Sequence, residues 1–197
     1  MAAEQFNEAE RYLLERWGEV ADLRKCISDM ENKQTQRLEN IAKRAIDSLP
    51  GGLNEWMLFG KPTKREIGVR KKKWVNKFTG LWVANISLEN LRDNHDSEPR
   101  AYVYFDGFDD ALLASCINTV NLHAKKIDLG KFGQLQQKKE SVWYPFPETK
   151  ADLIRMLTDN NGEAFDECII KHFECLAQSV PAVDEAVENA KKSRPTN

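Results

Sequence analysis

Two stretches decide the fold: LWVANISL at residues 81–88 and AYVYF at residues 101–105. Both are rich in β-branched and aromatic residues, which favour strands. The same composition predicts shorter strands at Glu55–Phe59, Glu66–Val69, Trp74–Phe78 and Val142–Tyr144. We therefore expect a small, mostly antiparallel sheet in the middle of the chain.

A long helix is predicted before this sheet, because residues 4–49 contain no proline and a single glycine. Its apolar side chains recur every seven residues, as in a coiled coil, and Met30 adds the second position of the repeat. The candidate oligomer seam consists of Phe6, Leu13, Val20, Ile27 and Met30. The polar run Glu31–Arg37 interrupts it. Either a helical hairpin within one chain or a homodimer would cover this seam.

Helices are also predicted after the main strands. Residues 108–127 have helical spacing and supply one crossover helix, and Thr149 with Asp152 forms a capping box that opens a helical tail. The expected class is thus α+β. Its parts are a helical arm at 1–49, an α+β core at 50–147, C-terminal helices at 148–192 and a frayed tail at 193–197.

Composition narrows the class of protein. The 197 residues are 41% hydrophobic and 30% charged, which allows a real core under a heavily ionised surface. No apolar run approaches the ~18 residues that span a bilayer, and the polar start MAAEQFNEAERY lacks the features of a secretory signal. Four scattered cysteines do not form a disulfide framework. We expect a soluble cytoplasmic protein without a membrane partner.

The net charge of −2 conceals a basic segment, because residues 50–80 carry eight basic and two acidic side chains. Cations release counterions from phosphates and aromatic faces stack on bases, so this mixture suits a nucleic acid or an acidic protein. The candidate binding residues are Lys61, Lys64, Arg65, Arg70, Lys71, Lys72, Lys73, Trp74 and Lys77. In the alternative interpretation, the aromatic residues are buried and the lysines are a solvated strand edge. Replacing the cations at 70–73 by glutamine should leave the fold intact.

Two groups of residues in the sequence have side chains that can bind a metal ion. Cys168, His172 and Cys175 share one helix face, but their apolar neighbours favour a packed core. Asp106 and Asp109 follow the strand at 101–105 and are weak candidates for Mg²⁺, although helix capping explains them as well. We therefore expect no bound metal and no cofactor.

The order of elements, helix, three strands, helix and strand, resembles the core of the PD-(D/E)XK nuclease-like superfamily over residues 38–145. That resemblance implies metal-dependent cleavage, which needs an acidic residue on the second strand and (D/E)-x-K on the third. The stretch 81–88 offers only Asn85, and the triplets Glu31–Lys33 and Glu148–Lys150 lie off the strands. The implied protein is a degenerate member that binds without cutting.

The sequence therefore favours a non-catalytic binding protein that engages DNA, RNA or an acidic protein partner through the segment 61–77. Common hydrolase and nucleotide-binding motifs are missing from the sequence. Two alternatives stay open: a nuclease-like enzyme with a diverged Mg²⁺ site, and a structural or assembly subunit that forms homo-oligomers through its N-terminal helix.

Overall fold

The computed structural model describes residues 7–59, 66–74, 79–87, 89–91, 97–105, 113–120, 136–138 and 141–192. Its helices are α1 (Glu8–Glu15), α2 (Trp17–Ser48), α3 (Gly52–Glu55), α5 (Lys150–Thr158), α6 (Glu163–Ala177) and α7 (Val180–Lys192), with a 3-10 turn at Asn160–Gly162 and a helical segment at 113–120. Its strands are β1 (Trp56–Leu58), β2 (Glu66–Lys71), β3 (Gly80–Ala84), β4 (Arg100–Tyr104), β5 (Gln136–Lys138) and β6 (Ser141–Pro145). The predicted α+β class is confirmed.

The strands form one sheet in the order β1-β2-β3-β4-β6-β5, and every neighbouring pair is antiparallel. The helical segment 113–120 lies between β4 and β6 in the chain, and these two strands are neighbours in the sheet. The predicted strands at 55–59, 66–69, 81–88, 101–105 and 142–144 correspond to β1, β2, β3, β4 and β6, while β5 was not predicted. Trp74 ends a turn rather than beginning a strand, and residues 75–78 lie outside the described part.

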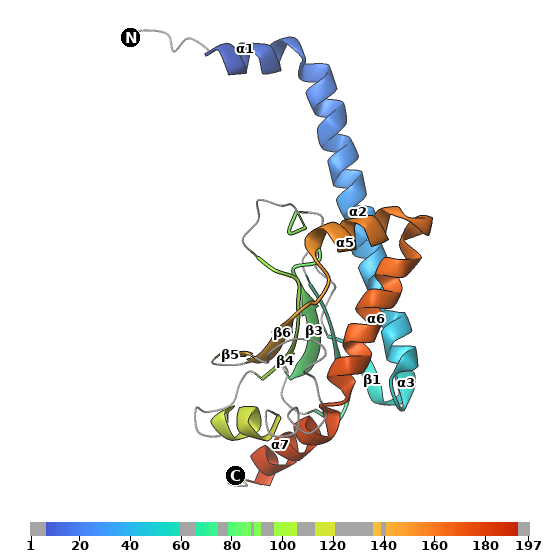
Figure 1. Ribbon diagram of the computed structural model, residues 1–197, viewed down its shortest axis with the longest axis vertical. Coiled ribbons are helices and arrows are strands. Elements are labelled where there is room, and N and C mark those ends of the chain that lie inside the picture. Colours follow the sequence, from blue (N-terminus) through green and yellow to red (C-terminus); the bar gives the residue numbers. More distant parts are fainter. Residues whose placement is uncertain are drawn as a thin grey trace.

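Side chains alternate between the two faces of the sheet, as strand geometry requires. Along β3 and β4, Leu81, Val83, Ala101 and Val103 are buried, whereas Tyr102 between them is partly exposed. Helices α2 and α6 lie together on the buried side (Figure 1). We call the opposite side the open face, because none of the described helices covers its centre.

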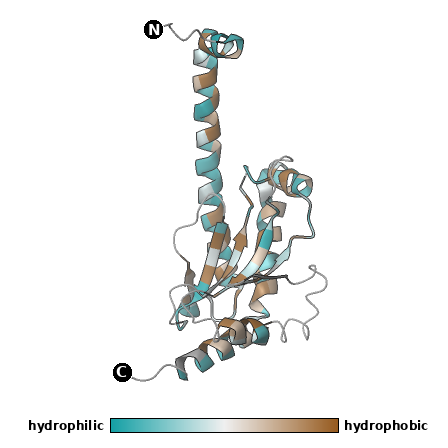
Figure 2. Cartoon of the chain, turned by 90° about the vertical axis from the view of Figure 1, so that its left-hand side faces the viewer, coloured by the Kyte–Doolittle hydropathy of each residue, from teal (hydrophilic) through white to brown (hydrophobic). Residues whose placement is uncertain are grey.

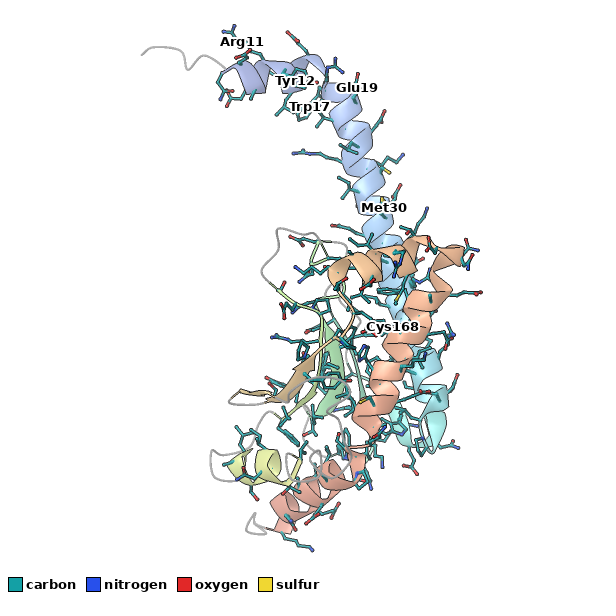
Figure 3. All side chains as sticks on the ribbon, viewed as in Figure 1. Arg11, Tyr12, Trp17, Glu19, Met30 and Cys168 are labelled. Carbon is teal, nitrogen blue, oxygen red and sulfur yellow. The ribbon has the colours of Figure 1, made fainter. Side chains whose placement is uncertain are left out.

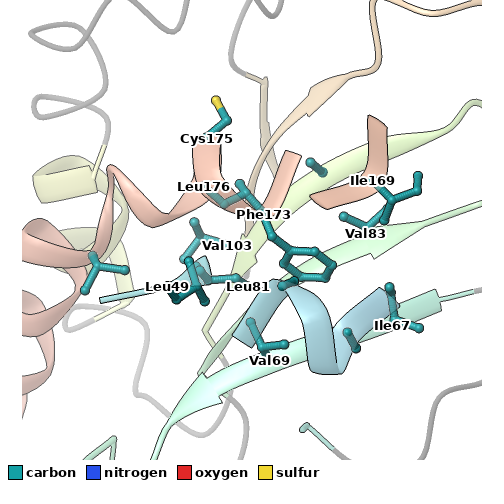
Figure 4. Packing of buried hydrophobic residues seen from close by; sticks show 14 of the residues in the cluster. Leu49, Ile67, Val69, Leu81, Val83, Val103, Ile169, Phe173, Cys175 and Leu176 are labelled. Atoms are coloured by element: carbon teal, nitrogen blue, oxygen red, sulfur yellow. The ribbon is translucent and has the colours of Figure 1, made fainter. Parts of the chain in front are cut away.

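The core lies between the sheet and these two helices. Phe173 of α6 is fully buried, and its ring points toward the strands, where Leu81 and Val83 lie (Figure 4). At the edge, Arg37 and Arg44 of α2 bind Asp166 of α6 at 2.6 and 3.0 Å. The second half of α2 is therefore part of the core rather than part of a separate arm.

Helix α2 runs through the polar stretch 31–37 without bending back, so a hairpin at that stretch is wrong. Gln34 explains the continuity, because its side chain is buried and donates a hydrogen bond of 2.9 Å to the carbonyl of Ile86. The chain bends earlier, at Arg16, where α1 ends. The seam positions Leu13, Ile27 and Met30 are exposed and Val20 is half-buried, while Phe6 lies outside the described residues.

The C-terminal part begins as predicted. The Thr149 hydroxyl accepts a hydrogen bond from the Asp152 backbone, and the Asp152 carboxylate accepts one from the Thr149 backbone. This capping box starts α5, and α6 and α7 follow it. Among the described helices, none combines the length and the apolar character needed to cross a membrane.

Candidate nucleic-acid interface

The structure separates the predicted basic segment into two groups with different roles. Arg70 lies on the open face, while Lys71, Lys73 and Trp74 turn toward helix α7. Lys72 donates a hydrogen bond of 2.7 Å to the carbonyl of Leu53. Lys61, Lys64, Arg65 and Lys77 lie outside the described residues.

Asp184 of α7 holds the second group. Its carboxylate accepts a hydrogen bond of 2.7 Å from the Trp74 indole and lies 3.0 Å from the ammonium groups of both Lys71 and Lys73. Lys71 is only 9% exposed, and its ammonium lies over the Trp56 ring at 5.6 Å. Burial alone would raise the pKa of Asp184, but the hydrogen bonds from Trp74, Lys73 and Lys71 lower it below its ordinary value. This cluster joins α7 to the end of β2.

Two expectations about this segment need correction. Trp74 is buried and packs edge-on against Trp56 at 5.6 Å, so it offers no stacking face to a base. We now expect the replacement of all four cations at 70–73 by glutamine to destabilise the fold, because Lys71 and Lys73 neutralise a carboxylate that is three-quarters buried. Buried charges depend on their partners.

Aromatic side chains occupy the open face in a row across neighbouring strands. The rings of Trp82 and Tyr102 stack at 6.1 Å with an angle of 9° between their planes. Phe59, just after β1, meets Trp82 edge-on at 4.7 Å, and Tyr104 meets Tyr102 edge-on at 6.3 Å. All four side chains are partly exposed. A row of π-faces on one side of a sheet can stack on successive bases.

Two glycines let the Trp82 indole lie close to the backbone. Gly68 is opposite Trp82 in the register between β2 and β3, and Gly80 lies two residues before it on the same face. A Cβ atom at Gly68 would approach the indole to 2.7 Å, and one at Gly80 would approach its nitrogen to 3.1 Å. Any larger residue at Gly68 would push the ring away from Tyr102.

Charged groups flank the aromatic row. The guanidinium of Arg70 lies 5.5 Å above the Phe59 ring, and that of Arg100 lies 5.8 Å above the Tyr102 ring. The Tyr102 hydroxyl donates a hydrogen bond of 3.1 Å to Glu66. Burial, followed by the negative charge of Glu66, raises the pKa of Tyr102 above its ordinary value, so this hydroxyl stays protonated. Arg70 and Arg100 thus bring two positive charges to the aromatic row, and Glu66 brings one negative charge.

A second polar cluster lies on the buried side of α6, around His172. His172 is 2% exposed, with its Nδ1 3.1 Å from the Tyr144 hydroxyl and its Nε2 3.2 Å from the Glu148 carboxylate. The imidazole stacks on Phe146 at 3.5 Å. Among the described residues, Glu148, Cys168 and His172 could together hold a metal ion, because their ligand atoms lie within 4.8 Å of one another.

The chemistry of this cluster suits packing better than catalysis. Burial and the neighbouring Glu148 carboxylate raise the pKa of the Cys168 thiol to about 12, so it is not a nucleophilic thiolate. Hydrogen bonds already occupy both nitrogens of His172. Cys168 and Cys175 are buried, as the packed-core interpretation predicts, and Cys116 is buried as well, whereas Cys26 is exposed. Asp106 and Asp109 lie outside the described part of the chain.

We expect His172 to make stability depend on pH. Burial lowers its pKa below the ordinary value of 6.5, so the unfolded chain takes up a proton near that pH while the folded chain does not. The free energy of unfolding should therefore fall as the pH drops below 6.5, by up to about 1.4 kcal/mol per pH unit. Glu148, whose pKa is lowered by its hydrogen bond with His172, contributes in the same direction only below its ordinary value of 4.5.

This dependence can be measured by urea denaturation of the parent chain and of His172→Gln. The measurements run from pH 7.5 to pH 5 in steps of about half a unit. The variant should lose most of the slope below pH 6.5 because glutamine does not titrate. Equal slopes in the two proteins would contradict the assignment.

A pattern in the sequence indicates most of the aromatic row. Tyr102 and Tyr104 alternate with apolar Ala101 and Val103, which places both tyrosines on the face away from the core. Trp82 alternates in the same way with the buried Leu81 and Val83, whereas the contribution of Phe59 depends on the pairing of β1 with β2. No protein-family model, curated protein or solved structure matches this chain significantly.

Proposed function

We propose that this chain is a non-catalytic protein that binds single-stranded nucleic acid on the open face of its sheet. The observation that carries the proposal is the stacked pair Trp82 and Tyr102, extended on either side by Phe59 and Tyr104. Bases stack on such rings at about 1–3 kcal/mol each, whatever their identity. A duplex buries its base faces, so the surface suits a single strand.

Charge supports the same assignment. Arg70 and Arg100 stand beside the aromatic row and can contact the phosphates between stacked bases. The sequence contains four further cationic residues near these strands. Three of them, Lys61, Lys64 and Arg65, precede β2, and Lys77 precedes β3. An acidic protein would need the cations but not the aromatic row, and for this reason we favour nucleic acid over an acidic partner.

The test is fluorescence anisotropy of labelled single-stranded DNA and RNA oligonucleotides titrated with the protein. In Tyr102→Val/Tyr104→Val, valine keeps the strand propensity and removes two π-faces, so affinity should fall about tenfold or more. Tyr12→Val is the matched control, because Tyr12 is an exposed aromatic residue on α1. Its affinity should equal that of the parent.

A variant that lacks two positive charges on the open face tests the phosphate contacts, and a second variant serves as its control. Arg70→Gln/Arg100→Gln should weaken binding to every sequence and make the slope of log K against log salt shallower. The control Lys43→Gln/Arg155→Gln removes two exposed positive charges from helices instead. No affinity in the parent, or unchanged affinity in the tyrosine variant, would contradict the proposal. Cleavage of the oligonucleotide with Mg²⁺ would favour the nuclease-like alternative.

A further inference from the structure

Within the described part of the chain, the first half of α2 projects away from the sheet and contains no buried residue (Figure 1), and we call it the free stretch. From Trp17 to Lys33 it spans 17 residues, about 25 Å, before Gln34 becomes the first buried residue. Along this free stretch, Leu23 is 60% exposed, Ile27 42% and Met30 48%. Apolar residues recur along it in Figure 2, and Figure 3 labels Trp17 at its start and Met30 near its end. Apolar surface of this extent on a projecting helix indicates a protein partner.

We infer that the partner is a second copy of this chain, whose free stretch packs antiparallel on the first. The heptad repeat places Val20 and Ile27 at one seam position and Leu23 and Met30 at the other. In an antiparallel pair these positions alternate, so Val20 faces Met30 of the second copy and Leu23 faces its Ile27. In both pairs, the two residue numbers lie at equal distances from position 25.

The free stretch has the same centre. Residues 17 and 33 lie at equal distances from position 25, so this register covers the stretch from end to end. The core of the second copy begins at its Gln34, opposite Arg16 of the first copy. At Arg16 the chain leaves the axis of α2, and α1 turns toward the side on which the sheet lies (Figure 1). The bend therefore coincides with the end of the pairing.

A parallel pair is sterically unfavourable. Val20, Ile27, Gln34 and Ile41 follow one another at seven residues on one face of α2, and the last two are buried in their own chain. A parallel partner that follows this face would meet the sheet and α6 at Gln34, where each copy already packs on itself. The antiparallel partner ends before that point.

The flanks of the seam distinguish the two orientations. In the antiparallel register, Cys26 lies beside Cys26 of the second copy, and Glu19 lies opposite its Lys33. On the other side of the seam, Arg24 of one copy lies beside Arg24 of the second copy, and these two positive charges repel each other. In a parallel pair, Arg24 would instead face Glu19 of the second copy, which is attractive.

Sedimentation velocity of the full chain across the micromolar range tests the seam. The parent should dimerise, and Leu23→Lys/Ile27→Lys should raise the dimer dissociation constant about a hundredfold or more, since it removes the central layers. Both side chains are exposed in the single chain, so the variant should fold. The control Ala21→Lys/Ser28→Lys adds the same charge to the opposite face of α2 and should remain a dimer.

Two variants test the orientation. Arg24→Gln should lower the dissociation constant of the antiparallel dimer a few-fold. Mild oxidation with copper–phenanthroline should link the two chains through a Cys26–Cys26 disulfide, and Cys26→Ser should abolish this link. The other three cysteines are buried and should not react. A parent that stays monomeric, a dimer that survives the Leu23/Ile27 change, or an Arg24 variant that dimerises more weakly would overturn the inference.

Discussion

Phe173→Ala is expected to lower the free energy of unfolding by about 3–5 kcal/mol. The side chain is fully buried and is among the largest in the core between α6 and the sheet. Its removal loses the apolar burial and leaves a cavity that surrounding strands and helices cannot fill without distortion. Urea denaturation followed by circular dichroism measures the change.

A graded series separates packing from other effects. Phe173→Leu fills much of the same volume, so it should cost about 1–2 kcal/mol. The exposed neighbour Lys171 provides the control, and Lys171→Ala should change stability by less than about 0.5 kcal/mol. If Phe173→Ala cost as little as Lys171→Ala, the assignment of α6 to the core would be wrong.

Asp184→Ala should cost about 2–4 kcal/mol. The substitution leaves the Trp74 indole N–H without its acceptor and leaves the ammonium of Lys71, which is almost buried, without its nearest carboxylate. Glu55 lies 3.6 Å from that ammonium but is itself largely exposed, so it compensates only in part. The measurement is again the urea midpoint, at neutral pH.

Asp184→Asn should lose less than Asp184→Ala, because an amide oxygen can still accept the hydrogen bond from Trp74. Glu185→Ala removes an exposed carboxylate from the next position of α7 and should be nearly neutral. Equal losses in the Asp184 and Glu185 alanine variants would show that α7 is not anchored through this cluster.

The local features of the fold could be predicted from the sequence. Strand composition identified β3 and β4, and the capping box identified the start of α5, because both depend on residues close together in the chain. The helix at 113–120 was predicted from the spacing of residues 108–127 for the same reason, and its Cys116 and Ile117 are buried. Such patterns need no knowledge of the partner element.

The role of the basic segment could not be predicted in this way. Lys71 belongs to a run of cationic residues, and such runs are typical of solvent-exposed surfaces. It is nevertheless buried, because Asp184, 113 residues later in the chain, packs against it. Gln34 is a comparable case, since a polar residue continues the buried face of α2 by bonding to Ile86. Contacts between distant segments decided both positions, and one sequence contains no sign of them.

Photo-cross-linking can locate a single strand of nucleic acid that stacks on the open face. A bromouridine-substituted oligonucleotide is irradiated with the full chain, and the linked peptides are located by mass spectrometry. We expect cross-links at Trp82, Tyr102 or Tyr104, and we expect them to disappear when unlabelled oligonucleotide competes. Specific cross-links found only on α2, α6 or α7 would contradict it.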